Sequence, residues 1–127
     1  MAYLLDTHTL IWLLDEPEQL SSKAHSAIMA TEHPLHISIA SLWEIAIKAG
    51  LDKLELSISF SEILDQLALN EVNILPILPE HLSAYLNLPL HHKDPFDRIL
   101  VAQASMQDLT IITRDKAFHL YNIPTLW

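Results

Sequence analysis

The chain has 127 residues, half of them apolar, and a formal net charge of −9. This length and apolar content predict a single domain over residues 1–127 with a substantial hydrophobic core. The chain has no cysteine and one glycine, which excludes disulfide frameworks, thiolate metal sites and the glycine-rich phosphate-binding loops of many nucleotide-binding proteins.

No apolar run approaches the length of about 18 residues that a membrane-spanning helix needs. The first residues are apolar, but they include Asp6 and have no basic flank, so they are not expected to form a signal peptide. Together with the lack of cysteine, these features predict a cytoplasmic protein without a membrane anchor.

Short apolar runs alternate along the chain with longer stretches of helical periodicity. Strands are predicted at residues 2–5, 35–38, 72–77, 109–113 and 123–127. Helices are predicted at residues 7–15, 21–32, 39–50, 59–71, 79–88 and 94–107, with a last helical turn at 115–121. Gly50 is expected to end the helix at 39–50 in the left-handed conformation. This alternation predicts an α/β domain in which helices cover both faces of a parallel sheet of four to five strands.

Acidic residues follow the ends of several predicted strands. Asp6 ends the first strand, Glu44 lies about one turn into the helix after the second, and Asp115 follows the fourth. Asp97 lies at the N-terminus of the helix that precedes the fourth strand. Because the carboxyl ends of parallel strands meet at one edge of a sheet, these acids are expected to lie close together.

Each acid also has a purely structural interpretation. Asp6 and Asp115 can each cap a following helix, and Ser41 with Glu44 matches a capping box. The sequence DPFD at 94–97 is a typical helix start, with an acid as N-cap and proline in the first turn. For a single acid, capping and metal binding both remain open.

The set of acids favours a metal site. Glu44 is the only acid in the apolar segment 37–50, where an unpaired carboxylate is costly. Several carboxylates at one sheet edge repel each other, and a cation relieves the repulsion. Oxygen ligands, without cysteine or suitably spaced histidine, select a hard cation such as Mg²⁺ or Mn²⁺. Such an ion can activate water and stabilise charge on a phosphate, which is the chemistry of phosphodiester hydrolysis.

Four segments together resemble the acidic motifs of PIN-domain nucleases, most closely the VapC-type toxins of bacterial toxin–antitoxin pairs. They read YLLDTH at 3–8, SLWEIAIK at 41–48, HHKDPFDRILVAQA at 91–104 and IITRDKAF at 111–118. The resemblance spans nearly the whole chain. It implies a three-layer α/β/α domain, Mg²⁺- or Mn²⁺-dependent endoribonuclease activity on RNA, and inhibition by a VapB-type antitoxin.

The resemblance also implies roles for individual residues. It places the acidic site on Asp6, Glu44, Asp97 and Asp115. Asp6 and Asp97 are expected to hold the principal metal, while the other two acids bind it directly or through water, orient ligands or activate water. Asp94 is expected to cap the helix or support the site, and Thr113 matches a serine or threonine that relatives often place two residues before the last acid.

Five of the seven bases flank these acids in sequence and are expected to contact substrate phosphate locally. They are Lys48, Lys93, Arg98, Arg114 and Lys116. The alternative is that they pair with neighbouring acids, above all Lys48, which lies four residues after Glu44. His91 and His92 precede the site and are candidate phosphate contacts, whereas His8 and the remaining histidines are expected in surface or core roles.

The sequence argues against two functions other than that of a nuclease. A PIN-like module that has lost catalysis and only binds a partner is disfavoured because all four acids are present. A receiver-like phosphoacceptor domain needs an acid at the end of the third strand, where residues 72–77 read VNILPI. The apolar content and the resemblance favour a homodimer, and the negative net charge suits a basic antitoxin tail. The sequence leaves the RNA target open.

Overall fold

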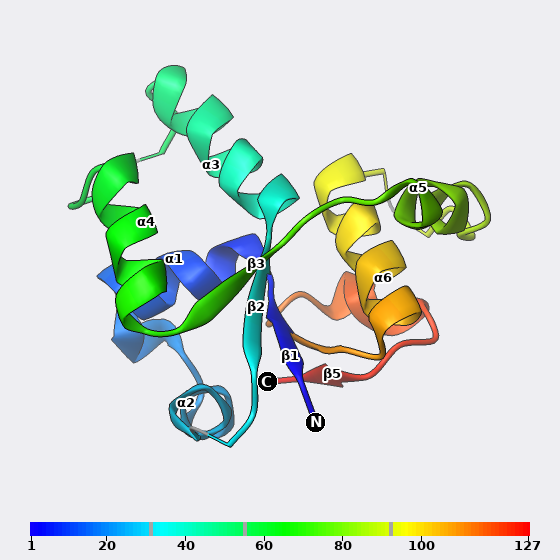
Figure 1. The fold of residues 1–127 in the computed structure, drawn as a ribbon, viewed down its shortest axis with the longest axis horizontal. Coiled ribbons are helices and arrows are strands. Elements are labelled where there is room, and N and C mark those ends of the chain that lie inside the picture. Colours follow the sequence, from blue (N-terminus) through cyan, green and yellow to red (C-terminus); the bar gives the residue numbers. More distant parts are fainter. Residues whose placement is uncertain (31, 55, 92) are drawn as a thin grey trace.

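Five short parallel strands form the centre of the fold (Figure 1). The computed structural model describes residues 1–30, 32–54, 56–91 and 93–127. The strands are β1 (Tyr3–Leu5), β2 (Leu35–Ser38), β3 (Val72–Leu75), β4 (Thr110–Ile112) and β5 (Thr125–Leu126). Their order in the sheet is β3-β2-β1-β4-β5, and all four neighbouring pairs are parallel. The first strand is therefore central, and the carboxyl ends of all strands share one edge.

Helices cover both faces of this sheet, so the predicted three-layer α/β/α architecture is confirmed (Figure 1). The helices are α1 (Thr7–Asp15), α2 (Ser22–Met29), α3 (Ile39–Gly50), α4 (Phe60–Leu69), α5 (Pro79–Leu86) and α6 (Pro95–Gln107), with 3-10 turns η1 (Pro17–Gln19) and η2 (Lys116–Leu120). In Figure 1, α1, α2 and α4 lie on one side of the sheet, and α5 and α6 lie on the other. α3 leaves the carboxyl end of β2 and contacts both α1 and α6.

Successive side chains of β1 enter opposite halves of the core, as the period of a strand requires. Leu5 packs with Leu10, Ile37 and other residues on the side of α1 to α4. Leu4 packs with Leu100 and others on the side of α6 and η2. Both leucines are fully buried, which explains why the strand reads as a continuous apolar run. Within the described residues, no helix is both long and apolar enough to cross a membrane.

The predicted order of elements is confirmed, but two helix ends were predicted wrongly. Gly50 lies within α3, and no glycine has a positive φ. The left-handed residue is Asp52, with φ of 53°. Its amide bonds to Ala49 O, and the next amide bonds to Lys48 O at 2.9 Å, which is the Schellman pattern. The helix predicted at 21–32 already ends at Met29, and residue 31 lies outside the described residues.

Candidate active site

Asp6 stands at the centre of the candidate site because it ends the central strand and begins α1. The side chain is 5 % exposed, and both carboxylate oxygens are engaged. Oδ1 accepts the amide of Thr9 at 2.8 Å, and Oδ2 accepts the hydroxyl of Thr113 at 2.5 Å. Burial raises the pKa of Asp6, and the hydrogen bonds from Thr113 and Thr9 oppose that rise. Asp6 thus caps α1 and still turns an oriented carboxylate toward the sheet edge.

Thr113 links Asp6 to the last acid of the set. Its side-chain oxygen also accepts the amide of Asp115 at 3.0 Å. Asp115 is itself exposed and caps η2, since its Oδ1 accepts the amide of Ala117 at 2.9 Å. A threonine at the end of β4 therefore positions both a buried carboxylate and the backbone of an exposed one.

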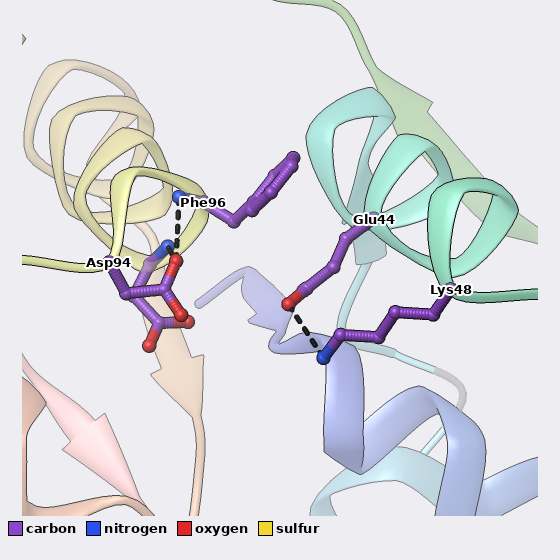
Figure 2. Close-up of polar contacts among 5 residues, drawn as sticks. Glu44, Lys48, Asp94 and Phe96 are labelled. Carbon is purple, nitrogen blue, oxygen red and sulfur yellow. Dashed lines mark hydrogen bonds and ion pairs between the residues drawn. The ribbon is translucent and has the colours of Figure 1, made fainter. Parts of the chain in front are cut away.

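Glu44 reaches the site from α3, where it is 7 % exposed. The helix begins at Ile39 with Ser38 as N-cap, and the Ser38 hydroxyl accepts the amide of Ala40 at 3.0 Å. The capping box proposed for Ser41 and Glu44 is therefore wrong, because both lie inside the helix. Glu44 instead forms an ion pair with Lys48 at 3.1 Å, one turn further along (Figure 2).

Asp94 and Asp97 have different roles at the start of α6. Asp94 is the N-cap, and its Oδ1 accepts the amides of Phe96 at 2.9 Å and Asp97 at 3.4 Å, with Pro95 in the first turn. The predicted helix start is thereby confirmed. Figure 2 shows the carboxylates of Asp94 and Glu44 both directed into the space between α6 and α3. The ring of Phe96 packs edge-on against Trp43 of α3, with ring centroids 5.4 Å apart, which is a direct contact between the two helices.

The electrostatics of Asp97 connect it to the other acids. Burial and the negative charges of four other carboxylates together raise the pKa of Asp97 to about 8. These are, in decreasing order, Asp94, Asp6, Glu44 and Asp115. Asp6 follows β1, Glu44 lies on α3, Asp94 caps α6 and Asp115 follows β4, so the four carboxylates come from elements at the carboxyl edge of the sheet.

The bases predicted to flank the site do not all lie at the protein surface. Arg98 is 7 % exposed, and its Nη1 donates to Pro89 O at 2.9 Å and Tyr121 Oη at 3.2 Å. Its guanidinium also lies 4.8 Å from the ring centroid of Tyr85. We therefore correct the expectation that Arg98 contacts substrate: it lies on the buried face of α6 and joins that helix to its neighbours.

The other candidate phosphate contacts lie at the surface. Lys93, Arg114 and Lys116 are exposed. Lys48 is paired with Glu44, in line with its alternative interpretation as an ion-pair partner. His91 packs edge-on against Tyr121, with centroids 5.0 Å apart. His92 lies outside the described residues.

An open hollow of about 320 Å³ adjoins the acids. It is lined by Asp6, His8, Trp12, Arg114 and Asp115. His8 was expected in a surface or core role, and neither its place in the lining of this hollow nor that of Trp12 was predicted. The only available signal was their spacing: His8 lies two residues after Asp6, and Trp12 lies one helical turn further along the same face.

Residues 3–123 match the model of the PIN domain family. The chain belongs to the PIN-domain family. It is 31 % identical over 130 residues to ribonuclease VapC22 of Mycobacterium tuberculosis, and the match covers 98 % of this chain and 97 % of that protein.

Two crystal structures of low sequence identity share the fold. VapBC2 from Rickettsia felis, bound to a DNA fragment from its promoter, has a TM-score of 0.75 at 17 % identity, covering 99 % of this chain and 98 % of that chain. DNA-bound VapBC from Salmonella typhimurium has a TM-score of 0.69 at 15 % identity, covering 99 % of this chain and 97 % of that chain.

The donor set of this PIN domain fits a hard cation by its chemistry. Its groups are carboxylate oxygens, the ligands that Mg²⁺ and Mn²⁺ prefer. The mutual repulsion that raises the pKa of Asp97 is what a bound cation would relieve. Within the described residues, no three carboxylate or imidazole groups lie close enough together to hold one ion. Small ions that keep several waters bind through one or two carboxylates, so they do not require three ligands from the protein.

Proposed function

We propose that this protein is a metal-dependent endoribonuclease that hydrolyses RNA phosphodiester bonds in the cytoplasm, as the toxin of a VapBC-type toxin–antitoxin pair. The observation that carries the proposal is the repulsion of Asp97 by four nearby carboxylates, which together with burial raises its pKa to about 8. Membership of the PIN-domain family and the similarity to a protein named ribonuclease VapC22 support it.

Asp6 and Asp97 are the residues we expect to hold a Mg²⁺ or Mn²⁺ ion. A bound ion of this kind supplies an activated water and stabilises charge on the phosphate. Glu44 and Asp115 complete the donor set, directly or through water. The protein orients the Asp6 carboxylate through Thr113 and the amide of Thr9. Because Asp6 is buried, these groups interact more strongly than they would in bulk water.

The experiment that tests this proposal is RNA cleavage after removal of metal. The purified protein is treated with a chelator and incubated with a pool of random-sequence RNA, and Mg²⁺ or Mn²⁺ is then added back. We expect no cleavage with chelator and restored cleavage with either ion. Cleavage that persists in chelator, or its absence with both ions, would contradict the proposal.

A second candidate function is that of an inactive PIN-like module that acts only by binding a partner. A bacterial growth assay distinguishes it from the ribonuclease. Expression of the toxin without its antitoxin is expected to arrest bacterial growth, and Asp6→Asn is expected to abolish the arrest. If Asp6→Asn arrests growth as strongly as the wild-type protein, binding rather than catalysis is responsible.

The proposed antitoxin partner is VapB-like. The net charge of −9 and the acidic edge suit a basic segment of such a partner, which would neutralise the carboxylates and compete with the metal. The similar crystal structures described above are VapBC complexes. Added antitoxin is expected to suppress RNA cleavage in proportion to its concentration.

We also propose a homodimer. Trp43 is 61 % exposed and stands between two apolar hollows, one toward α5 and α6 and one toward α4. Covering such a surface with a second copy removes apolar area from water. Sedimentation of the toxin alone is expected to give a dimer, and Trp43→Arg is expected to give a monomer. Leu69→Arg, at an exposed apolar position of α4, is the matched control; a monomeric wild-type protein would contradict the proposal.

A further inference from the structure

One wall of the hollow beside the acids is formed by side chains that have no role in the proposed metal chemistry. His8 and Trp12 lie one turn apart on α1, with ring centroids 5.8 Å apart and ring planes 40° from parallel. The guanidinium carbon of Arg114 lies 5.8 Å from the centroid of the Trp12 ring. Trp12 also packs against Trp127, whose ring centroid is 5.7 Å away. A fixed indole thus supports an imidazole and a guanidinium at the edge of the site.

Arg114 differs from the other bases near the acids. Lys48 is paired with Glu44, and Arg98 is buried among its own hydrogen-bond partners. Arg114 is exposed and makes no ion pair within the described part of the chain. A guanidinium that rests on an aromatic ring keeps its N–H donors free at its rim, in the fork geometry that fits phosphate oxygens.

His8 adds a second donor on the same wall. It is exposed, lines the hollow together with Asp6, and is close enough for its charge to influence that carboxylate. Even a neutral imidazole offers one N–H, so a hydrogen bond to phosphate does not require protonation of His8. Carboxylates and phosphate donors therefore line one and the same hollow.

Resting on the proposed ribonuclease activity, we propose that Arg114 and His8, positioned by Trp12, bind the RNA phosphate next to the one that is cleaved. In a protein of net charge −9, an RNA strand needs local cations beside the acids, and Arg114 is the base that lines the hollow. The guanidinium and the imidazole attract an anion, so this wall of the hollow fits an RNA phosphate, while the carboxylates of the hollow remain the part that a basic antitoxin segment would neutralise.

The test uses an RNA oligonucleotide that the wild-type protein cleaves, selected from a random-sequence pool. Cleavage kinetics are measured for wild type, Arg114→Gln, Arg114→Lys and His8→Asn. The matched controls are Lys23→Gln and His25→Asn, which remove a basic residue and a histidine at exposed positions on α2. Binding of the same fluorescent RNA is measured by anisotropy in an Asp97→Asn background at several salt concentrations, and thermal unfolding of each variant is recorded.

We expect Arg114→Gln and His8→Asn to raise KM about tenfold, the loss of a hydrogen bond to a charged group, while kcat and thermal unfolding stay close to wild type. We expect Arg114→Gln to reduce the slope of log affinity against log salt concentration by about 0.7, the value for one phosphate contact on a single strand. Arg114→Lys is expected to retain that slope, and both α2 controls are expected to behave as wild type.

If wild-type protein cleaves the RNA but Arg114→Gln leaves KM and the salt slope unchanged, the subsite assignment is overturned and the ribonuclease proposal stands. If the variants weaken only the binding of antitoxin, the wall is a peptide site and the assignment is again wrong. If wild-type protein cleaves no RNA with Mg²⁺ or Mn²⁺, the proposed function itself fails and takes the subsite with it.

Discussion

The hydroxyl of Thr113 donates a hydrogen bond of 2.5 Å to Asp6 Oδ2, although the two residues are 107 positions apart in sequence. The contact follows from strand register: Leu5 pairs with Ile112 in the parallel ladder between β1 and β4. Asp6 directly follows β1 and Thr113 directly follows β4, so the two residues are neighbours at the shared carboxyl edge. Sheet pairing alone brings the hydroxyl to the carboxylate and fixes the orientation of one of its oxygens.

Thr113→Val is predicted to reduce RNA cleavage about 10- to 100-fold, the usual cost of losing a hydrogen bond that orients a metal ligand. Thr113→Ser retains the hydroxyl and is predicted to keep most of the activity. Cleavage rates and metal affinity by calorimetry measure the effect, with Thr110→Val on the same strand as the matched control. Equal rates for the valine and serine variants would show that the hydroxyl does not orient Asp6.

Stability of the metal-free protein is predicted to fall as the pH rises. The pKa of Asp97 is about 8 in the folded chain, against an ordinary value of 3.8. Between these values the folded state binds a proton that the unfolded state releases, so the free energy of unfolding decreases with pH. The contribution is fully present below about 3.8 and is lost as the pH rises through about 8.

Asp97→Asn removes this titrating group and is predicted to make the free energy of unfolding fall less steeply as the pH rises. Urea unfolding in chelator, across the same pH window, measures the difference between the variant and the wild-type protein. The variant is expected to be the more stable of the two at the alkaline end. A decline as steep as that of wild type would mean that Asp97 does not carry the raised pKa.

Asp94 is predicted to act through the helix rather than through the metal. Asp94→Ala removes the N-cap of α6 and should lower the free energy of unfolding by about 1 kcal/mol, whereas Asp94→Asn still caps. Asp94→Asn also removes the largest charge contribution to the raised pKa of Asp97. We expect RNA cleavage by Asp94→Asn to stay close to wild type. Loss of cleavage without loss of stability would instead assign Asp94 to the metal.

Arg98 is predicted to be a structural residue. Arg98→Met loses the hydrogen bonds to Pro89 O and Tyr121 Oη and should lower the free energy of unfolding by about 2 kcal/mol. The same variant should leave the salt dependence of RNA binding unchanged. Arg114→Gln is the comparison, with the opposite pattern expected. A changed salt slope for Arg98→Met would restore its assignment to substrate binding.

Local signals predicted the elements and the acidic edge well. Asp94 followed by proline marks the start of α6. Convergence of the acids follows from parallel topology, because Asp6 and Asp115 each lie just beyond a strand. These inferences depend on neighbours in sequence or on a rule of sheet topology, and both are readable from the chain itself.

Contacts between distant segments were not predictable in the same way. Arg98 lies one residue after Asp97, yet the helix turns it by about 100° onto the buried side, where Tyr121 and Tyr85 receive it. The hollow formed by His8 and Arg114 depends on how α1 lies beside the end of β4. Gly50 was predicted to be the left-handed residue because of its residue type, whereas Asp52, two residues later, adopts that conformation.

The most direct test of the central claim compares RNA cleavage by Asp97→Asn and Asp108→Asn with Mg²⁺ present. Both variants make the same substitution at opposite ends of α6, and Asp108, at φ of 55°, occupies a left-handed position that asparagine tolerates. If the converging carboxylates form the catalytic centre, Asp97→Asn is folded and inactive while Asp108→Asn cleaves RNA like the wild-type protein. A folded Asp97→Asn protein that cleaves RNA as fast as Asp108→Asn would contradict the account.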